Sequence, residues 1–521
     1  MSKDFCLLDE PWLPVRLTDG RVVDLGLREV FQRSGEIVAL AETAPPSLVA
    51  QYRLLLAITH RALTRAQGHW RPADRVRWFR DGLPLPAVQD YLDHWRDHFA
   101  LFHPQQPFLQ VAALSEAPAT RDKRKPWTQI ALASANGNTP VVFDHAVDTQ
   151  PTALAPAQAL GTLLGFLQFT PGGLVKCLRD ADKAGPLANT AAILPVGATL
   201  AQTLCLALHP SPRPGEEDVD LPAWERPPLT LAQLQGEPVP ASGPNDRYTR
   251  QSRAVLLVPE ADGQVRWLHF AAGWALADES HAPDPMACFR VGSQGLVRVG
   301  FTEGRAFWRD LPAMVPMPAA AEGLSSQAAA TLQFAVALHQ AMGWTVPDQP
   351  LLVAGLASEK AKLLRWRSEF LTLPTALTAN PDKAAELREQ VALAESVHRA
   401  VAQLAVGLLA ATLPDPTSQD TRARARALLE AGPFTASYYA AAQRALPALM
   451  QALAHDRAEQ ALNAWQATLH DAALQAWDAV WRGLGRSPQA LKADALFWPR
   501  LQGALKQHLP CHPSLATPEE A

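Results

Sequence analysis

The stretch LPTALTANPDK, residues 373–383, separates two kinds of sequence. Upstream of it, from about residue 200, short apolar runs alternate with turn residues and predict β-strands and irregular loops. Downstream, almost everything to residue 507 is rich in Ala and Leu with helical periodicity. We therefore predict an α+β fold, in which a large mixed domain of helices and small β-sheets over residues 1–375 precedes a helical domain over residues 376–521.

Three breaks divide the helical text of residues 376–521. They lie at LPDPTSQD (413–420), AGPF (431–434) and GLGRSP (483–488), and each is rich in Pro, Gly or small polar residues. These breaks leave about four helices joined by short connections. The pattern predicts an up-and-down four-helix bundle.

Both helices and hairpins are predicted in residues 1–375. Apolar periodicity predicts helices at residues 46–67, 85–102 and 156–169, and the last of these opens with Pro156 at a position that a helix tolerates. Alternating segments with turn residues between them predict hairpins in LTDGRVV, at residues 253–270 with a turn at 260–263, and at residues 349–371.

The composition is that of a packed protein. The chain has 521 residues, of which 48% are hydrophobic and 19% are charged, so two or three domains are expected. A net charge of −4 argues against a free-standing nucleic-acid binder but leaves room for local basic patches. Five scattered cysteines without a CxxC pair favour a reducing compartment and give no zinc signature. No signal peptide is apparent and the longest apolar run, residues 400–413, is too short to span a bilayer, so we expect a cytoplasmic protein.

FLQFTPGGLVK, residues 166–176, places Gly172 and Gly173 directly after a predicted helix. Paired glycines let a backbone approach a ligand or a neighbouring helix closely, because no Cβ intervenes. The pattern GxxxxGK[ST] is missing from the sequence, so this stretch is not a Walker phosphate loop. A side-chain-free edge against a DNA groove and a helix end packed on a neighbour both remain open.

Evidence for an enzyme is weak. GxGxxG, GxSxG and HExxH motifs are all missing, and no pair of carboxylates stands out as an acid/base couple. His94 and His98 in DHWRDH have a spacing that suits two metal ligands on a helix, but a third ligand is missing nearby. Two polar histidines on an amphipathic helix are the favoured interpretation, and no metal or cofactor is predicted.

Two basic segments point toward nucleic acid. RDKRK, with Arg121, Lys123, Arg124 and Lys125, could neutralise phosphates, although a solvated loop explains it equally well. SEKAKLLRWR, residues 358–367, places four cations and a tryptophan on or beside a predicted hairpin turn. Such a tip could enter a groove, or it could be an ordinary charged surface.

In order along the chain, several segments resemble the large subunit (CasA family) of the type I-E CRISPR surveillance complex, Cascade. They are LLDEPWLPVRLTDGRVVDLGLREVF near the N-terminus, LFHPQQPFLQ (101–110), LQFTPGGL, RQSRAVLL (250–257), LLVAGLASEKAKLLRWR and the closing helical region. The resemblance covers nearly the whole chain. It implies a non-catalytic subunit that binds the 5′ handle of the crRNA and recognises the protospacer-adjacent motif (PAM) of duplex DNA.

The resemblance also implies help in separating the DNA strands and a docking surface for the helicase-nuclease that destroys the target. The expected partners are therefore the other Cascade subunits, crRNA, double-stranded target DNA and the helicase-nuclease. The minor groove mainly distinguishes A·T from G·C, so a subunit that reads it should tolerate several PAM sequences.

The resemblance assigns sites residue by residue. The family's glycine loop corresponds to Thr170, Pro171, Gly172 and Gly173. Its wedge hairpin corresponds to Ser358, Glu359, Lys360, Ala361 and the adjoining Lys362, with Lys360 where other members present glutamine. Its lysine finger corresponds to the turn at residues 259–266, where only Gln264 and Arg266 can donate into a groove. Its anchoring loop for the complex and the crRNA handle corresponds to residues 134–143, including Asn136, Gly137, Asn138 and Phe143.

Two other functions are kept as alternatives. The chain could be a purely structural assembly subunit of the same complex, with DNA contacts that have degenerated because the finger and wedge residues differ. It could also be an unrecognised enzyme that uses His94 and His98.

Overall fold

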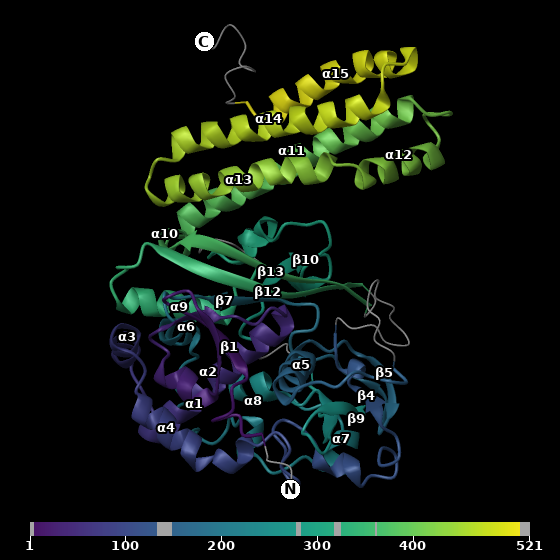
Figure 1. Cartoon of the computed structure of the whole chain (residues 1–521). Helices are drawn as coiled ribbons and strands as arrows, with labels where there is room; N and C mark the ends of the chain where they lie inside the picture. The colour runs from purple at the N-terminus through teal and green to yellow at the C-terminus, as the bar shows by residue number, and fades with distance from the viewer. Residues whose placement is uncertain (1–4, 133–147, 278–282, 317–324, 360–361, 511–521) are drawn as a thin grey trace. The chain divides into compact units, whose positions relative to one another are not determined.

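The computed structural model describes residues 5–132, 148–277, 283–316, 325–359 and 362–510. The chain forms two compact units, and the predicted α+β class is confirmed (Figure 1). Unit 1 comprises Met1–Glu303 and Leu324–Leu371, and unit 2 comprises Gly304–Gly323 and Thr372–Ala521. No pattern in the sequence predicts that residues 304–323 belong with the C-terminal helices.

Small antiparallel sheets make up the β-structure. One sheet has the order β2-β1-β3, a second β13-β12-β7, and a third β4-β9-β8, while β5–β6 and β10–β11 are two-stranded. The strands are β1 Leu13–Leu17, β2 Val22–Leu25, β3 Ile37–Leu40, β4 Lys125–Pro126, β5 Gly173–Cys177, β6 Arg179–Asp182, β7 Ala191–Pro195, β8 Arg253–Pro259, β9 Val265–Ala272, β10 Phe289–Gly292, β11 Gly295–Arg298, β12 Asp348–Glu359 and β13 Lys362–Pro374.

Helix α2 lies at the centre of unit 1. It is buried on all sides from Pro45 to Thr64, and it packs on α4, α5, α6, α8 and β12. The α-helices described in unit 1 are α1 Leu27–Gln32, α2 Pro45–Gln67, α3 Pro72–Asp81, α4 Leu85–His94, α5 Pro156–Phe169, α6 Leu200–Ala207, α7 Leu231–Gln235, α8 Pro244–Thr249 and α9 Ala330–Ala341. Short 3-10 helices are η1 Arg96–Phe99, η2 Ala112–Ser115, η3 Trp127–Gln129 and η4 Ala223–Glu225.

Most of the predicted elements of unit 1 are present. The helices at 46–67 and 156–169 and the hairpins at 253–270 and 349–371 are confirmed within a few residues. The predicted helix at 85–102 is wrong in its second half, because α4 ends at His94 and a separate 3-10 turn follows.

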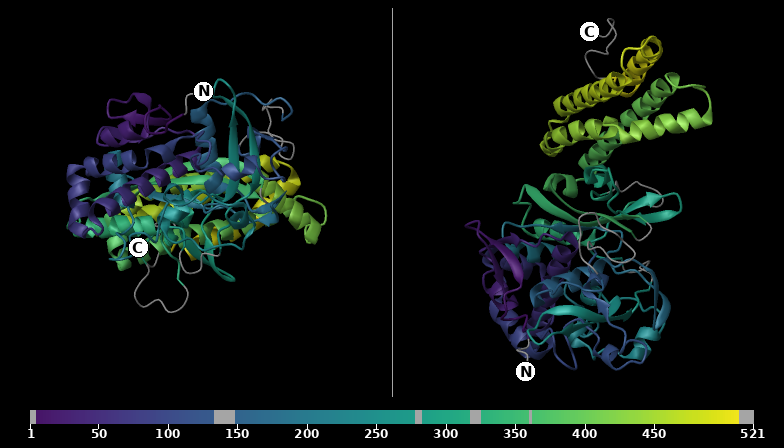
Figure 2. Two further views of the ribbon diagram at one scale, coloured as in Figure 1. Left: turned by 90° about the horizontal axis from the view of Figure 1, so that it is seen from below. Right: turned by 45° about the vertical axis from the view of Figure 1, so that its right-hand side comes forward.

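Unit 2 is helical. It contains the 3-10 helix η5 Phe307–Ala313, together with α10 Thr375–Ala379, α11 Pro381–Ala411, α12 Gln419–Ala431, α13 Phe434–Ala454, α14 Ala458–Leu484 and α15 Pro488–His508. Figure 1 and Figure 2 show the long helices α11, α13, α14 and α15 side by side, and the shorter α12 connects α11 to α13.

Sequence signals mark three of the helix starts described in unit 2. The side chain of Asn380 caps α11 by accepting the N–H of Asp382 at 2.9 Å, and Pro381 occupies the first turn. Ser418 and Ser487 cap α12 and α15 in the same way. The predicted segment at 435–482 is two helices rather than one, because a turn at residues 455–457 with Asp456 at φ 56° separates α13 from α14.

Among the described residues, no helix is long and apolar enough to cross a membrane.

Candidate nucleic-acid interface

The glycine loop, residues 170–173, follows α5 directly. Thr170 is only 2% exposed; its N–H donates to the last turn of α5 at 2.8 Å and its carbonyl accepts from Gly185 at 2.8 Å. Gly172 and Gly173, in contrast, are exposed. The loop is therefore fixed at its helix end and open at its glycine end.

Different constraints act on the two glycines. A Cβ on Gly172 would lie 3.2 Å from the amide nitrogen of Ala184 and 3.4 Å from the carbonyl oxygen of Asp182, so the neighbouring chain leaves little room. A Cβ on Gly173 would meet nothing within 4 Å, but its φ of +152° disfavours any L side chain. Packing thus constrains Gly172, whereas Gly173 presents bare backbone to open space.

A buried arginine joins this loop to the end of β6. The Arg253 side chain on β8 is 4% exposed, and its guanidinium lies 3.0 Å from the fully buried carboxylate of Asp182. The same guanidinium donates to the carbonyl of Lys183 at 2.7 Å and to the carbonyl of Pro171. Burial lowers the pKa of Arg253, and the charge of Asp182 opposes that shift. Arg253 therefore ties the glycine loop and the end of β6 to one point of the β8–β9 sheet.

Asp182 is the acidic partner of Arg253, and we call this buried ion pair the Arg253–Asp182 clamp. Its carboxylate also accepts the backbone N–H of Gly273 at 2.7 Å and that of Lys183 at 2.9 Å, and it pairs with Arg179. With two guanidinium groups and two amides around it, the buried charge is fully compensated. The β5–β6 hairpin is consequently fastened to β9, beside which it packs.

Arg250, at the start of RQSRAVLL, has a supporting role of the same kind. Its side chain is completely buried, donates to the carboxylate of Asp246 at 2.7 Å, and lies over the ring of Trp274 with 3.7 Å to the ring centroid. The two arginines of the motif thus anchor the beginning of β8 through two buried ion pairs.

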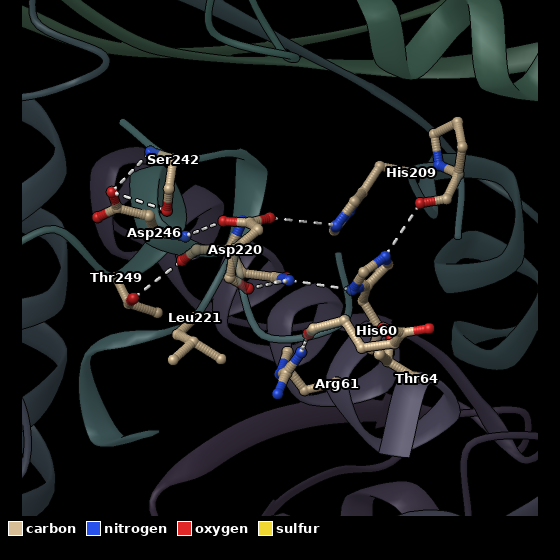
Figure 3. A network of polar contacts seen from close by, with 12 residues as sticks. His60, Arg61, Thr64, His209, Asp220, Leu221, Ser242, Asp246 and Thr249 are labelled. Atoms are coloured by element: carbon tan, nitrogen blue, oxygen red, sulfur yellow. Dashed lines mark hydrogen bonds and ion pairs between the residues drawn. The ribbon is translucent and has the colours of Figure 1, made fainter. Parts of the chain in front are cut away.

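A buried polar network holds the segment before β8 on α2 (Figure 3). Asp220 accepts the first backbone N–H groups of α8, from Asn245 and Asp246, both at 2.9 Å, and burial raises its pKa to about 6. The His60 ring stacks on His209 at 3.6 Å between centroids. Burial lowers the pKa of His60 to about 3 and that of His209 well below its ordinary value, so both rings are neutral at pH 7.

The turn at residues 259–266 joins β8 to β9 and contains the predicted finger. Gln264 is half-buried. The Arg266 guanidinium pairs with Glu260 at 3.0 Å and donates to the carbonyl of Pro151 at 3.0 Å. Arg266 is therefore already engaged within the protein, and it is a weaker candidate for a groove contact than its position in the turn suggested.

The basic segment at residues 121–125 runs into the same sheet. Lys125 begins β4, which pairs with β9 next to the finger turn. All five residues are exposed, and Arg121 pairs weakly with Asp122 at 3.4 Å. The sequence alone could not place this segment, whereas the structure puts it at the edge of the sheet that carries Arg253.

Further cations belong to the β5–β6 hairpin. Lys176 and Lys183 are exposed, and Lys123 and Lys125 lie near enough to Cys177 to lower its pKa, although desolvation raises that pKa by more. Within the described parts of the chain, no carboxylate lies within ion-pair distance of these lysines. We call Lys123, Lys125, Lys176 and Lys183 the lysine rim of the glycine loop.

The predicted wedge hairpin is formed by β12 and β13, which end at Glu359 and begin at Lys362. Lys360 and Ala361, at its predicted tip, lie outside the described residues. Farther along β13, Arg365 pairs with Glu303 at 3.4 Å, and Trp366 is 39% exposed. Lys360 and its neighbours Ser358, Glu359, Ala361 and Lys362 remain predicted DNA contacts.

Known proteins are similar to this chain in sequence. Residues 7–476 match the family model described as CRISPR-associated protein Cse1. The CRISPR-associated protein CasA/Cse1 of Thermus thermophilus is 35% identical over 506 residues, which cover 94% of this chain and 95% of the relative. The chain belongs to the CasA/Cse1 family. The predicted resemblance to the large subunit of type I-E Cascade is thereby confirmed.

Solved CasA/Cse1 structures have the same fold. The crystal structure of Thermus thermophilus CasA is 33% identical with a TM-score of 0.81, over 97% of this chain and 100% of that one. A chain of a structure described as a CRISPR RNA-guided surveillance complex is 24% identical with a TM-score of 0.71, over 96% and 99% of the two chains. At that identity the second likeness concerns the fold alone.

Two other predicted features of this CasA/Cse1 chain have different outcomes. The anchoring loop with Asn136, Gly137, Asn138 and Phe143 lies outside the described residues and stays a prediction. His94 and His98 do not share one helix, because α4 ends at His94; they bond instead to Arg65 at 3.1 Å and to the carbonyl of Trp224 at 2.7 Å. Among the described residues, no cluster of three or more His, Cys, Asp or Glu side chains suits a metal ion.

The residues that position the glycine loop were not predicted. Asp182 stands in the polar run RDADK, which has no distinguishing pattern, and Arg253 stands in the family-like segment RQSRAVLL. A signal was available for Arg253: it precedes the apolar run AVLLV at the start of a strand, where an arginine next to the core needs a buried acidic partner. Nothing local in the sequence identifies that partner as Asp182, because 71 residues separate the two.

Proposed function

We propose that this chain is a non-catalytic large subunit of a type I-E RNA-guided surveillance complex and that it recognises the PAM of duplex DNA through the glycine loop. One observation carries the proposal: Gly172 and Gly173 are exposed while a buried Arg253–Asp182 pair fixes the loop that bears them. A rigid edge without side chains suits close approach of backbone groups to the minor groove.

The lysine rim supplies the second requirement of such a site. Exposed lysines around a groove-reading loop would contact phosphates and bind without regard to sequence, while the loop itself discriminates base pairs. A chain with a net charge of −4 would then depend on this local patch and on the assembled complex for its affinity.

The remaining functions rest on family membership. We propose that the chain contacts the 5′ handle of the crRNA through residues 134–143, assists strand separation with the β12–β13 hairpin, and offers a docking surface to the helicase-nuclease. Its partners would be the other Cascade subunits, crRNA, target DNA and that nuclease.

A second candidate function is a purely structural assembly subunit. The engagement of Arg266 with Glu260 and Pro151 favours it, because the finger turn then keeps little that is free to enter a groove. Under this alternative the subunit assembles normally but contributes nothing to the choice of target.

Reconstitution separates the two functions. The chain is co-expressed with the other complex subunits and crRNA, and the purified complex is titrated with matched duplexes that carry or lack a candidate PAM. We expect PAM-dependent binding that disappears when the chain is left out. Equal affinity for both duplexes across a panel of PAM sequences would support the assembly function instead.

A further inference from the structure

A cationic cavity in unit 2 has no part in the interface described above. It has a volume of about 640 Å³ and lies between α11, α12 and α15, with Thr435 of α13 at its edge. Small-molecule sites in proteins typically measure roughly 300 to 1,000 Å³. The cavity is therefore large enough for a ligand of nucleotide size.

Four arginines line this cavity. Arg399 comes from α11, Arg422 and Arg426 from α12, and Arg500 from α15, and all four are exposed to solvent. In the described part of the chain, no acidic side chain lies within ion-pair distance of any of them. The guanidinium of Arg500 lies over the ring of Phe497, with 5.1 Å from its central carbon to the ring centroid.

The acidic residues of the cavity do not neutralise these arginines. Glu395 is turned to other partners: it binds Arg309 and accepts the hydroxyl of Tyr439 at 3.0 Å. Glu430 is exposed at the rim. His398 adds no charge either, because burial lowers its pKa to about 4.

Two of these arginines lie close together on one helix. Arg422 and Arg426 are one helical turn apart on the same face of α12, and like charges at this spacing repel each other. Guanidinium groups are also well suited to phosphate oxygens, because their fork of N–H donors matches the geometry of the anion. A multiply charged phosphate in the cavity would relieve the repulsion and satisfy the donors together.

We propose that this cavity binds a small ligand with two or more phosphate groups, of the nucleoside di- or triphosphate class. Arg422 and Arg426 are the principal phosphate contacts, since they project from one helix, and Arg399 and Arg500 close the site from two others. This binding is distinct from any DNA contact of unit 1.

The test uses the full-length protein and isothermal titration with ATP, with pyrophosphate and with a single-stranded oligonucleotide. The double variant R422Q/R426Q removes two charges and keeps helix-forming side chains. The matched control is R424Q, because Arg424 is an exposed arginine of the same helix that does not line the cavity.

We expect one saturable ATP site per chain. Two charge-assisted contacts, at about tenfold each, predict a loss of about a hundredfold in affinity for R422Q/R426Q, and R424Q should bind within about twofold of wild type. Circular dichroism checks that α12 remains helical, and R500Q on α15 tests the same cavity if the double variant misfolds. The proposal is overturned if wild type fails to bind ATP, if R424Q weakens binding equally, or if only the oligonucleotide binds.

Discussion

Replacing Arg253 by methionine should release the glycine loop. The change keeps an unbranched apolar stem but removes the contacts of the guanidinium with Asp182 at 3.0 Å, with the carbonyl of Lys183 at 2.7 Å and with the carbonyl of Pro171. Removing one partner of a buried ion pair costs about 3 to 5 kcal/mol, because the other charge stays buried. Arg179 still pairs with Asp182, so we expect the lower end, about 3 kcal/mol.

Hydrogen exchange measures this release where it happens. The amide of Gly185 donates to the carbonyl of Thr170 at 2.8 Å and reports the closure of the loop onto the chain after β6. A loss of about 3 kcal/mol corresponds to exchange that is faster by roughly a hundredfold. Amides in the middle of α11, in the other unit, should keep their wild-type rates.

The matched control is Arg266→Met. Arg266 also bridges a carboxylate and a carbonyl, but its side chain is 40% exposed, and exposed pairs contribute about 1 kcal/mol or less. If Arg253→Met changes exchange at Gly185 by less than about threefold, or no more than the control does, the clamp does not hold the loop and the reasoning fails.

Three further predictions concern other parts of the chain. Changing Lys123 and Lys125 together to Gln should reduce the salt dependence of DNA binding by the assembled complex. The slope of log K against log salt should fall in magnitude by about 0.9 for each lost phosphate contact, and an unchanged slope would show that these lysines do not contact DNA. Asn380→Ala should lower the free energy of unfolding of unit 2 by about 1 kcal/mol in denaturant titrations, because α11 loses its N-cap, and no change would contradict that role. Burial lowers the pKa of His60 from 6.5 to about 3 and lowers the pKa of His209 well below 6.5, so below pH 6.5 the unfolded chain binds more protons than the folded chain. The stability present above pH 6.5 is therefore lost as the pH falls, by about 1.4 kcal/mol per pH unit for each ring. The variant His209→Phe should flatten this loss between pH 6.5 and pH 5 in urea titrations, and a slope as steep as that of wild type would be the contrary result.

Sequence patterns predicted those elements whose signals are local. Pro156 and the leucine periodicity after it predicted α5, and the stretch LPTALTANPDK predicted where the long C-terminal helices begin. The turn between α13 and α14 was missed because residues 455–457 include neither glycine nor proline. Asp456 adopts a positive φ there, a conformation that aspartate tolerates, but an aspartate in a sequence does not by itself predict the end of a helix.

The exposed residues of the candidate site were predicted, but the buried contacts that hold them in place were not. The exposed glycines could be found from FTPGG and the family resemblance, whereas the Arg253–Asp182 clamp depends on a contact between distant strands. For Arg266 the sequence suggested too much. Its residue type and its position in a turn suggest a groove contact, but its guanidinium already binds the carbonyl of Pro151 and the carboxylate of Glu260, which only the tertiary structure reveals.

The most direct test of the central claim is the affinity of the assembled complex for a PAM-bearing duplex when Gly173 is changed to alanine. A Cβ at this position meets nothing within 4 Å of protein, so its bulk would fall on the DNA. Gly215→Ala controls for backbone strain, because Gly215 also has a positive φ, +87°, and open space around it. We predict that Gly173→Ala weakens PAM-dependent binding by about tenfold or more, or about 1.4 kcal/mol, while Gly215→Ala binds as wild type does. Equal, undiminished binding by both variants would contradict the assignment of the glycine loop to PAM recognition.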